Sequence, residues 1–183
     1  MMPVEFSVAA YRFGHSQVRK AYIITPGGAK IQVFNPTAND DLHGGRPITS
    51  DHVIFWPNFL PVDGQLVANI SRKIDTLLSS GLFTLPIPGA EPAGSAILAK
   101  RNIQRARGYG LPSGQAVAER LKLDDDSIHV YTNAEIASSI PRLAVLTTDA
   151  YQATLANQSE APLWLYILAD MRRYLLHVYN TVL

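Results

Sequence analysis

The sequence contains no cysteine and comparatively little charge. Of its 183 residues, 17% are charged and 47% are hydrophobic, so it is more apolar than an average soluble domain. Without cysteine it can form neither disulfides nor thiolate metal sites. Its 16 basic and 15 acidic residues give a formal net charge of +1, so nothing electrostatic favours nucleic acid or an anionic membrane as a partner. The apolar excess indicates a large interior, or a surface that packs against a missing segment, a cofactor or a partner.

Long hydrophobic runs are also absent. The longest candidate, residues 163–169, is followed at once by Asp170, so we interpret it as part of a buried helix and expect no membrane span. The N-terminus lacks the basic start and the apolar run of a secretory signal, which leaves the compartment open with the cytoplasm as the default. The length predicts a single domain, residues 1–183, with a sizeable core.

The pattern of apolar and turn residues predicts a mainly α-helical fold with one small β-hairpin. Two β-rich runs, 22–25 and 31–34, flank the turn residues 26–28 and predict the hairpin. A surface loop is expected over 35–50 and a linker over 86–94. Ser95, Ser113 and Asn133 are predicted helix caps. Helices are expected over residues 4–19, 51–60, 69–80, 95–107 and 114–121, between 133 and Pro141, and over 162–179.

Two of these predicted helices carry a candidate site. His15 lies on an apolar helix, with Arg12 one turn before it, and Asn102 lies on another helix, with Arg105 one turn after it. A spacing of three residues places each arginine on the same face as its neighbour. Neutral imidazole is a common axial ligand of haem iron, and it binds best when its other ring nitrogen is hydrogen-bonded. Arginines suit the two carboxylates of a haem, and Gly14 would let a flat ring approach the backbone.

Simpler interpretations remain open for each residue. A lone histidine on an apolar helix is more often a buried structural residue. The helix from Lys100 to Arg107 can be a solvated basic face or a phosphate-binding stripe, although the near-neutral net charge disfavours nucleic acid. Asn102 is a poor helix former, but a polar surface position would explain it.

Three segments resemble the animal-type haem peroxidase superfamily, and particularly its bacterial members. They are EFSVAAYRFGHS at 5–16, IDTLLSSGLF at 74–83 and NIQRARGYGLP at 102–112, and the resemblance covers roughly residues 3–168. It implies a helical, myeloperoxidase-like fold and a peroxidase that oxidises a small donor with hydrogen peroxide, in the response to oxidative stress. It further implies that His15 is the proximal iron ligand, that Asn102 hydrogen-bonds this histidine, and that Arg12 and Arg105 lie near the haem propionates.

The chain also departs from the pattern of that superfamily. Its members carry a distal histidine, with a glutamine and an arginine, before the proximal helix, and also a calcium loop and ester-forming carboxylates; this sequence begins at the proximal helix. We therefore expect no distal catalytic residue here, and weak or no peroxide turnover by this chain alone. Residues 169–183 diverge from the family pattern, as in a truncated or frame-shifted gene.

Two alternatives accompany the peroxidase prediction. Fatty-acid dioxygenases of the superfamily place a radical tyrosine three residues before the proximal histidine; Arg12 stands there, and Tyr11 precedes it. The other alternative is a non-catalytic helical remnant or interaction module, whose uncovered apolar surface binds a separate distal-half chain or a second copy of itself.

Overall fold

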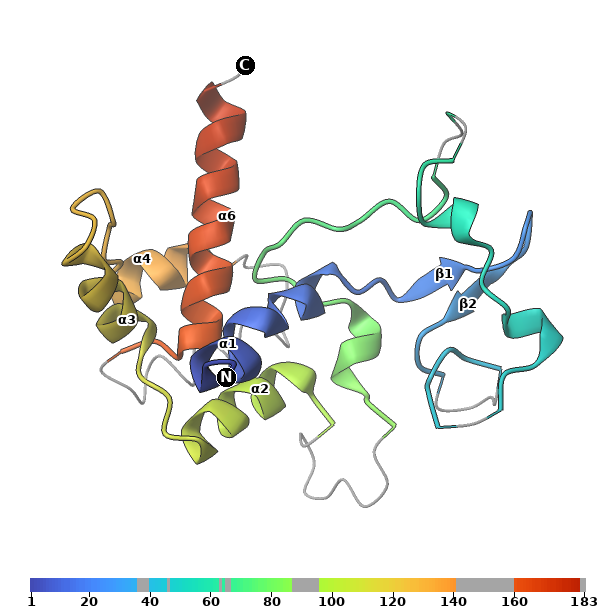
Figure 1. The fold of residues 1–183 in the computed structure, drawn as a ribbon, viewed down its shortest axis with the longest axis horizontal. Coiled ribbons are helices and arrows are strands. Elements are labelled where there is room, and N and C mark those ends of the chain that lie inside the picture. The colour runs from blue at the N-terminus through green and yellow to red at the C-terminus, as the bar shows by residue number, and fades with distance from the viewer. Residues whose placement is uncertain are drawn as a thin grey trace. The chain divides into compact units, whose positions relative to one another are not determined.

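The computed structural model describes residues 1–35, 40–45, 47–62, 64, 67–86, 96–140 and 160–181. Figure 1 shows helices, short 3₁₀ turns and one two-stranded sheet. In chain order the elements are α1 (Val4–Val8), η1 (Ala10–Gln17), β1 (Ala21–Ile23), β2 (Lys30–Gln32), η2 (Ser50–His52), η3 (Trp56–Asn58), η4 (Ser80–Phe83), α2 (Leu98–Gly108), α3 (Gly114–Lys122), α4 (Asn133–Ser138) and α6 (Leu163–Thr181).

The contacts divide the protein into two compact units. Unit 1 comprises Met1–Gln17, Lys73–Leu78 and Leu98–Leu183, and unit 2 comprises Val18–Arg72 and Ser79–Ile97. The prediction of a mainly helical protein with a small hairpin is confirmed at this coarse level. The prediction of a single domain stays a prediction.

The core of unit 1 forms around the first half of α6. Trp164, Leu165, Leu168 and Ala169 are fully buried there, and α6 contacts η1, α2, α3 and α4. In Figure 1 the second half of α6 extends beyond these helices. The helix predicted over 162–179 is thus confirmed, and its apolar start is explained by burial in this core.

Helices α3 and α6 approach each other closely at Gly114. A Cβ built on this residue would lie 2.1 Å from the Tyr166 side chain, so a larger residue would force the helices apart. Ser113 caps α3 as predicted, because its hydroxyl accepts a hydrogen bond from the Ala116 amide at 3.0 Å. The cap of α4 is Thr132, one residue before the predicted Asn133, and it forms a capping box with Glu135.

The first predicted helix, 4–19, is helical to Gln17 but changes its geometry on the way. The α-helix ends at Val8, and a 3₁₀ helix, η1, follows. Side chains bond to two carbonyls in η1: the Trp164 indole donates to Arg12 at 3.1 Å and the Ser16 hydroxyl donates to Phe13 at 2.8 Å. The Ser16 bond is local and competes with the regular backbone pairing, whereas the Trp164 bond is a tertiary contact from α6.

Unit 2 contains the predicted hairpin. Strands β1 and β2 pair antiparallel, with Tyr22 opposite Ile31. The turn between them needs Gly27, whose φ of 62° lies in the left-handed region. Two asparagine side chains, Asn58 and Asn69, bond to the backbone of β1 and so attach the following segments to the hairpin.

Two predicted helices are wrong. Residues 51–60 contain only the 3₁₀ turns η2 and η3, and 69–79 is not helical, since Ser80 is the first residue of η4. In the latter segment Asp75 accepts a hydrogen bond from the Leu77 amide at 2.7 Å, and Thr76 donates to the Ser139 carbonyl at 3.2 Å. Such side-chain bonds compete with the helical backbone pattern. The linker beyond Pro86 and the cap at Ser95 lie outside the described residues.

Candidate functional site

His15 and Asn102 meet in unit 1 although 87 residues separate them in the sequence. His15 lies on η1 and is half-buried, whereas Asn102 lies on α2 and is 2% exposed. The Nδ2 atom of Asn102 lies 2.9 Å from Nδ1 of His15. The predicted contact between these two side chains is therefore present, with the amide nitrogen rather than the expected oxygen nearest the ring.

The orientation of the Asn102 carboxamide decides what His15 can bind. As oriented, Nδ2–H donates to Nδ1, so the neutral ring carries its proton on Nε2. A half-turn of the carboxamide brings the oxygen to Nδ1, moves the proton there and leaves the Nε2 lone pair for a metal. Among the described residues, Asn102 has no other side-chain hydrogen bond that would oppose this rotation.

Arg12 lies on the same side of η1 as His15, because side chains three residues apart are aligned in a 3₁₀ helix. Burial lowers the pKa of Arg12, and the positive charge of Arg105 lowers it further, while Tyr109 opposes the shift. The Nε atom of Arg12 is buried without a hydrogen-bond partner. Within the described residues, neither arginine forms an ion pair with a carboxylate. Among the side chains that the structure describes, these two neighbouring cations therefore have no counter-anion.

Burial and a nearby cation keep the His15 ring neutral. Desolvation is the larger cause that lowers its pKa, and the charge of Arg12 is the second. A neutral imidazole is the form that ligates a metal, so the electrostatics of this site favour ligation over a structural ion pair.

Open space adjoins Gly14 and Arg105, and the hollow at Arg105 is not lined by His15. No described atom lies within 4 Å of the position that a Cβ would take on Gly14. A hollow of about 460 Å³ adjoins the end of α2 and is lined by Arg101, Gln104, Arg105, Gly108 and Tyr109. The structure thus brings together all four predicted site residues, Arg12, His15, Asn102 and Arg105, in unit 1.

The Tyr11 side chain is directed toward solvent and Phe6. Its side chain is 68% exposed, and its ring lies 5.8 Å from that of Phe6. Arg12, and not a tyrosine, occupies the position three residues before the histidine.

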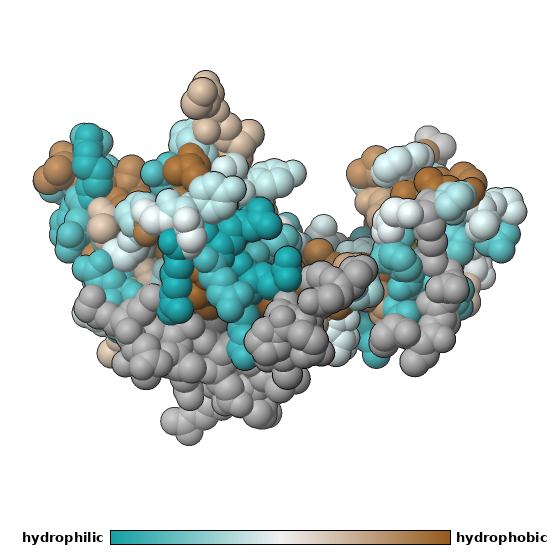
Figure 2. Space-filling view, turned by 90° about the horizontal axis from the view of Figure 1, so that it is seen from below, coloured by the Kyte–Doolittle hydropathy of each residue, from teal (hydrophilic) through white to brown (hydrophobic). Residues whose placement is uncertain are grey.

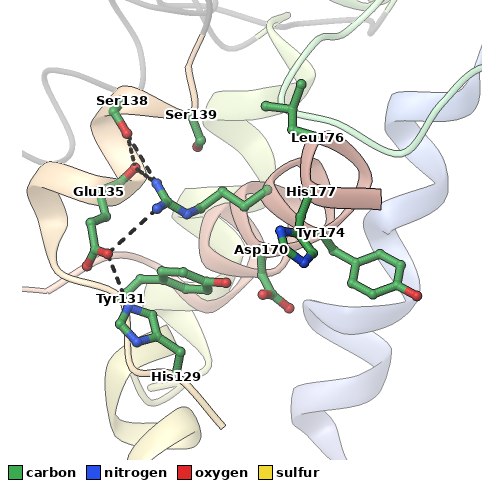
Figure 3. A pocket seen from close by; sticks show the side chains of 10 residues that line it. His129, Tyr131, Glu135, Ser138, Ser139, Asp170, Tyr174, Leu176 and His177 are labelled. Carbon is green, nitrogen blue, oxygen red and sulfur yellow. Dashed lines mark hydrogen bonds and ion pairs between the residues drawn. The ribbon is translucent and has the colours of Figure 1, made fainter. Parts of the chain in front are cut away.

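A larger hollow, of about 650 Å³, lies elsewhere in unit 1 and was missed by the sequence analysis. Figure 3 shows its lining, which comes from α4, the segment before it, and α6. The signal that could have drawn attention to this region is the capping-box pattern from Thr132 to Glu135, whereas the sequence analysis placed the cap at Asn133. The lining residues are His129, Tyr131, Glu135, Ser138, Ser139, Asp170, Arg173, Tyr174, Leu176 and His177.

The described residues contain neither a cluster of metal ligands nor a helix that could span a membrane. No group of three or more histidine, aspartate or glutamate side chains is placed to hold a metal ion there. In the same part of the chain, every helix is too short or too polar to cross a bilayer, in agreement with the sequence-based expectation.

Comparisons with known proteins leave the family relationship as a resemblance. No family model, no curated protein and no solved structure matches this chain.

Proposed function

We propose that this chain binds haem on the His15 side of a peroxidase-type site. The single observation that carries the proposal is the contact between His15 and Asn102 at 2.9 Å, which joins the two segments whose motifs resemble the superfamily.

The residues present fit the chemistry of haem. A half-buried neutral imidazole offers one nitrogen as ligand, and the Asn102 carboxamide holds the other. The buried and unpaired Nε of Arg12, beside the charge of Arg105, fits a carboxylate partner such as a propionate. Bound haem would supply peroxide-dependent oxidation of a small donor.

The protein's own groups would set the properties of the ligand. Asn102, accepting from Nδ1–H, would fix the ring orientation and increase the basicity of Nε2. Arg12 would act twice, since its charge keeps His15 neutral and also attracts an anionic group. Burial of Asn102 excludes water that would otherwise compete for the ring.

Reconstitution with haemin tests the proposal directly. The wild-type protein should give the Soret band of a histidine-ligated haem, and His15→Ala should lose it. His15→Gly should regain the band when imidazole is added, because the small ligand fills the space left by the ring. His177→Ala, which removes an exposed histidine from α6, is the matched control and should retain the band. Equal spectra for wild type and His15→Ala would refute the proposal.

A second set of variants tests the role assigned to Asn102. Asn102→Leu should still bind haem through His15, but the iron–histidine stretching frequency should fall because the ring loses its acceptor. An unchanged frequency would mean that Asn102 only fills space. Arg12→Gln should weaken haem affinity without changing the ligand band.

A second candidate function, a helical interaction module without catalysis, is favoured by exposed apolar side chains. Phe6, Tyr109, Leu121 and Leu123 of unit 1 are each between 42% and 80% exposed. Figure 2 shows brown hydrophobic atoms in several separate groups on the face it draws. Gel filtration without haem distinguishes the candidates: defined self-association that haem does not change supports the interaction module, whereas a haem-dependent change supports the first proposal.

A further inference from the structure

We propose that the hollow between α4 and α6 binds a small primary ammonium compound, with Asp170 as its anionic anchor. The hollow, of about 650 Å³, falls within the size range of small-molecule sites. Its lining belongs entirely to unit 1 and is independent of His15.

One of its two carboxylates is already compensated. Glu135 accepts from His129 Nε2 at 3.1 Å and lies 3.7 Å from Nη2 of Arg173. It also accepts from the Thr132 amide at 2.8 Å as part of the capping box. Arg173 in turn donates to the Glu135 carbonyl and the Ser138 hydroxyl, both at 3.3 Å. The guanidinium group of Arg173, the one arginine among the described residues that line the hollow, is therefore directed toward α4.

Asp170 is the carboxylate without a cation. Within the described residues it forms no ion pair, and, after burial, its charge is the largest cause that raises the pKa of the neighbouring Tyr131 phenol. In Figure 3 the Tyr131 ring lies between the carboxylates of Glu135 and Asp170, so Asp170 faces a different part of the hollow. A half-buried carboxylate without a counter-ion favours a cationic ligand.

The hydrogen-bonding groups select the kind of cation. Burial raises the pKa of Tyr131, and the charge of Asp170 and the hydrogen bond to it raise the pKa further, so the phenol stays protonated. In Figure 3 the Tyr131 hydroxyl points toward the Asp170 carboxylate, so a phenol oxygen and carboxylate oxygens lie near each other as acceptors. Two adjacent acceptors suit the N–H groups of a primary ammonium ion better than a quaternary one.

Aromatic groups complete the lining. Tyr174 lies one turn after Asp170 on α6 and is 61% exposed at the hollow. The guanidinium carbon of Arg173 lies 5.0 Å from the centre of the Tyr131 ring, so this ring already attracts a cation. An alkyl chain attached to the ammonium group can contact Tyr174 and Leu176 at the opening.

Titration with butylammonium chloride, followed by amide and side-chain NMR, tests the site. Saturable shifts are expected at Tyr131, Asp170 and Tyr174. Asp170→Asn, nearly identical in shape, should weaken binding about tenfold or more, which corresponds to about 1.4 kcal/mol. Asp126→Asn removes an exposed carboxylate outside the hollow and is the matched control for net charge. Tyr174→Ser, an exposed position, should weaken binding less.

Each outcome of this experiment either supports or overturns the proposed site. Loss of binding in Asp170→Asn with retention in Asp126→Asn supports the site. Equal weakening in both variants, equal binding of sodium butyrate, or shifts confined to other residues would each overturn it. Tetramethylammonium should bind more weakly than butylammonium; the reverse order would overturn the assignment of a primary ammonium ligand. If Asp170→Asn loses its helical circular dichroism, the Tyr174→Ser variant and the butyrate comparison still decide.

Discussion

Units 1 and 2 are built in different ways from the same chain. Unit 1 buries whole side chains of α6, such as Trp164 and Leu168, among capped helices. In unit 2 the regular structure is two three-residue strands and short 3₁₀ turns, and Asn58 and Asn69 bond directly to the backbone of β1. Unit 1 therefore depends mainly on apolar burial, and unit 2 depends more on a few polar side chains.

This difference indicates which single substitutions should destabilise each unit. Burial spreads stabilisation over many contacts, so a large loss requires the removal of a large side chain. Where one amide side chain makes several hydrogen bonds, much of the stabilisation depends on that residue. Its removal leaves the partner groups without hydrogen bonds. The two tryptophans of the sequence allow the units to be followed separately, since Trp164 lies in unit 1 and Trp56 in unit 2.

The largest effect is expected from Trp164→Ala. The side chain is fully buried and its indole donates to the Arg12 carbonyl, so the change should lower the free energy of unfolding by about 3–5 kcal/mol. Trp56→Ala, at a site 61% exposed, should change it by less than about 0.5 kcal/mol. Denaturant unfolding followed by circular dichroism measures both variants. Similar losses from the two substitutions would contradict the contrast between the units.

The helices with apolar periodicity and a local cap were the part of unit 1 that the sequence predicted best. In unit 1, apolar periodicity and local caps such as Ser113 determine helices directly, and α3 and α6 form where expected. Lys73–Leu78, half of the failed helix over 69–80, also lies in unit 1. Thr76 there donates to the Ser139 carbonyl, 63 residues away, and apolar periodicity does not report such a bond.

The candidate site could be predicted only in part. The contact between His15 and Asn102 was expected from the resemblance of two segments, because one motif contains the histidine and the other contains the asparagine. The hollow at Asp170 depends on α4 meeting α6, and a single sequence does not show which helices pack together. Its polar residues are unremarkable one by one.

The next largest effect is expected in unit 2 from Asn69→Ala. The Asn69 side chain accepts from the Ile23 amide at 3.0 Å and donates to the carbonyls of Ile23 and Asn58 at 2.8 and 3.1 Å. Its removal should cost about 2 kcal/mol, because the partly buried partners lose their bonds. The Trp56 fluorescence transition should shift to lower denaturant. Asn58→Ala, which removes two such bonds, should cost less; a larger loss from Asn58→Ala would contradict this ranking.

A smaller effect is expected from Thr132→Ala at the start of α4. The threonine hydroxyl accepts from the Glu135 amide at 3.3 Å, and Glu135 bonds back to the Thr132 amide. Loss of the cap should cost about 1 kcal/mol. Thr132→Ser keeps the hydroxyl and should retain most of the stability that Thr132→Ala loses. The Trp164 transition should report the change while the Trp56 transition stays in place. A shift of the Trp56 transition alone would contradict the prediction that the Thr132 cap stabilises unit 1 and not unit 2.

The smallest effect should be a pH dependence that separates the units between pH 7 and about 5. Burial and Arg12 lower the pKa of His15 below its usual 6.5, so the unfolded chain takes up more protons in this range and unit 1 loses stability as the pH falls through 6.5. In unit 2, burial raises the pKa of Asp41, but hydrogen bonds from Asn35 and His43 outweigh it and lower the pKa below 3.8. The stabilisation from Asp41 is therefore lost only at lower pH. Trp164 unfolding should depend on pH in this window in the wild type and lose that dependence in His15→Gln, whereas a pH dependence that persists in His15→Gln would place the responsible proton elsewhere in unit 1.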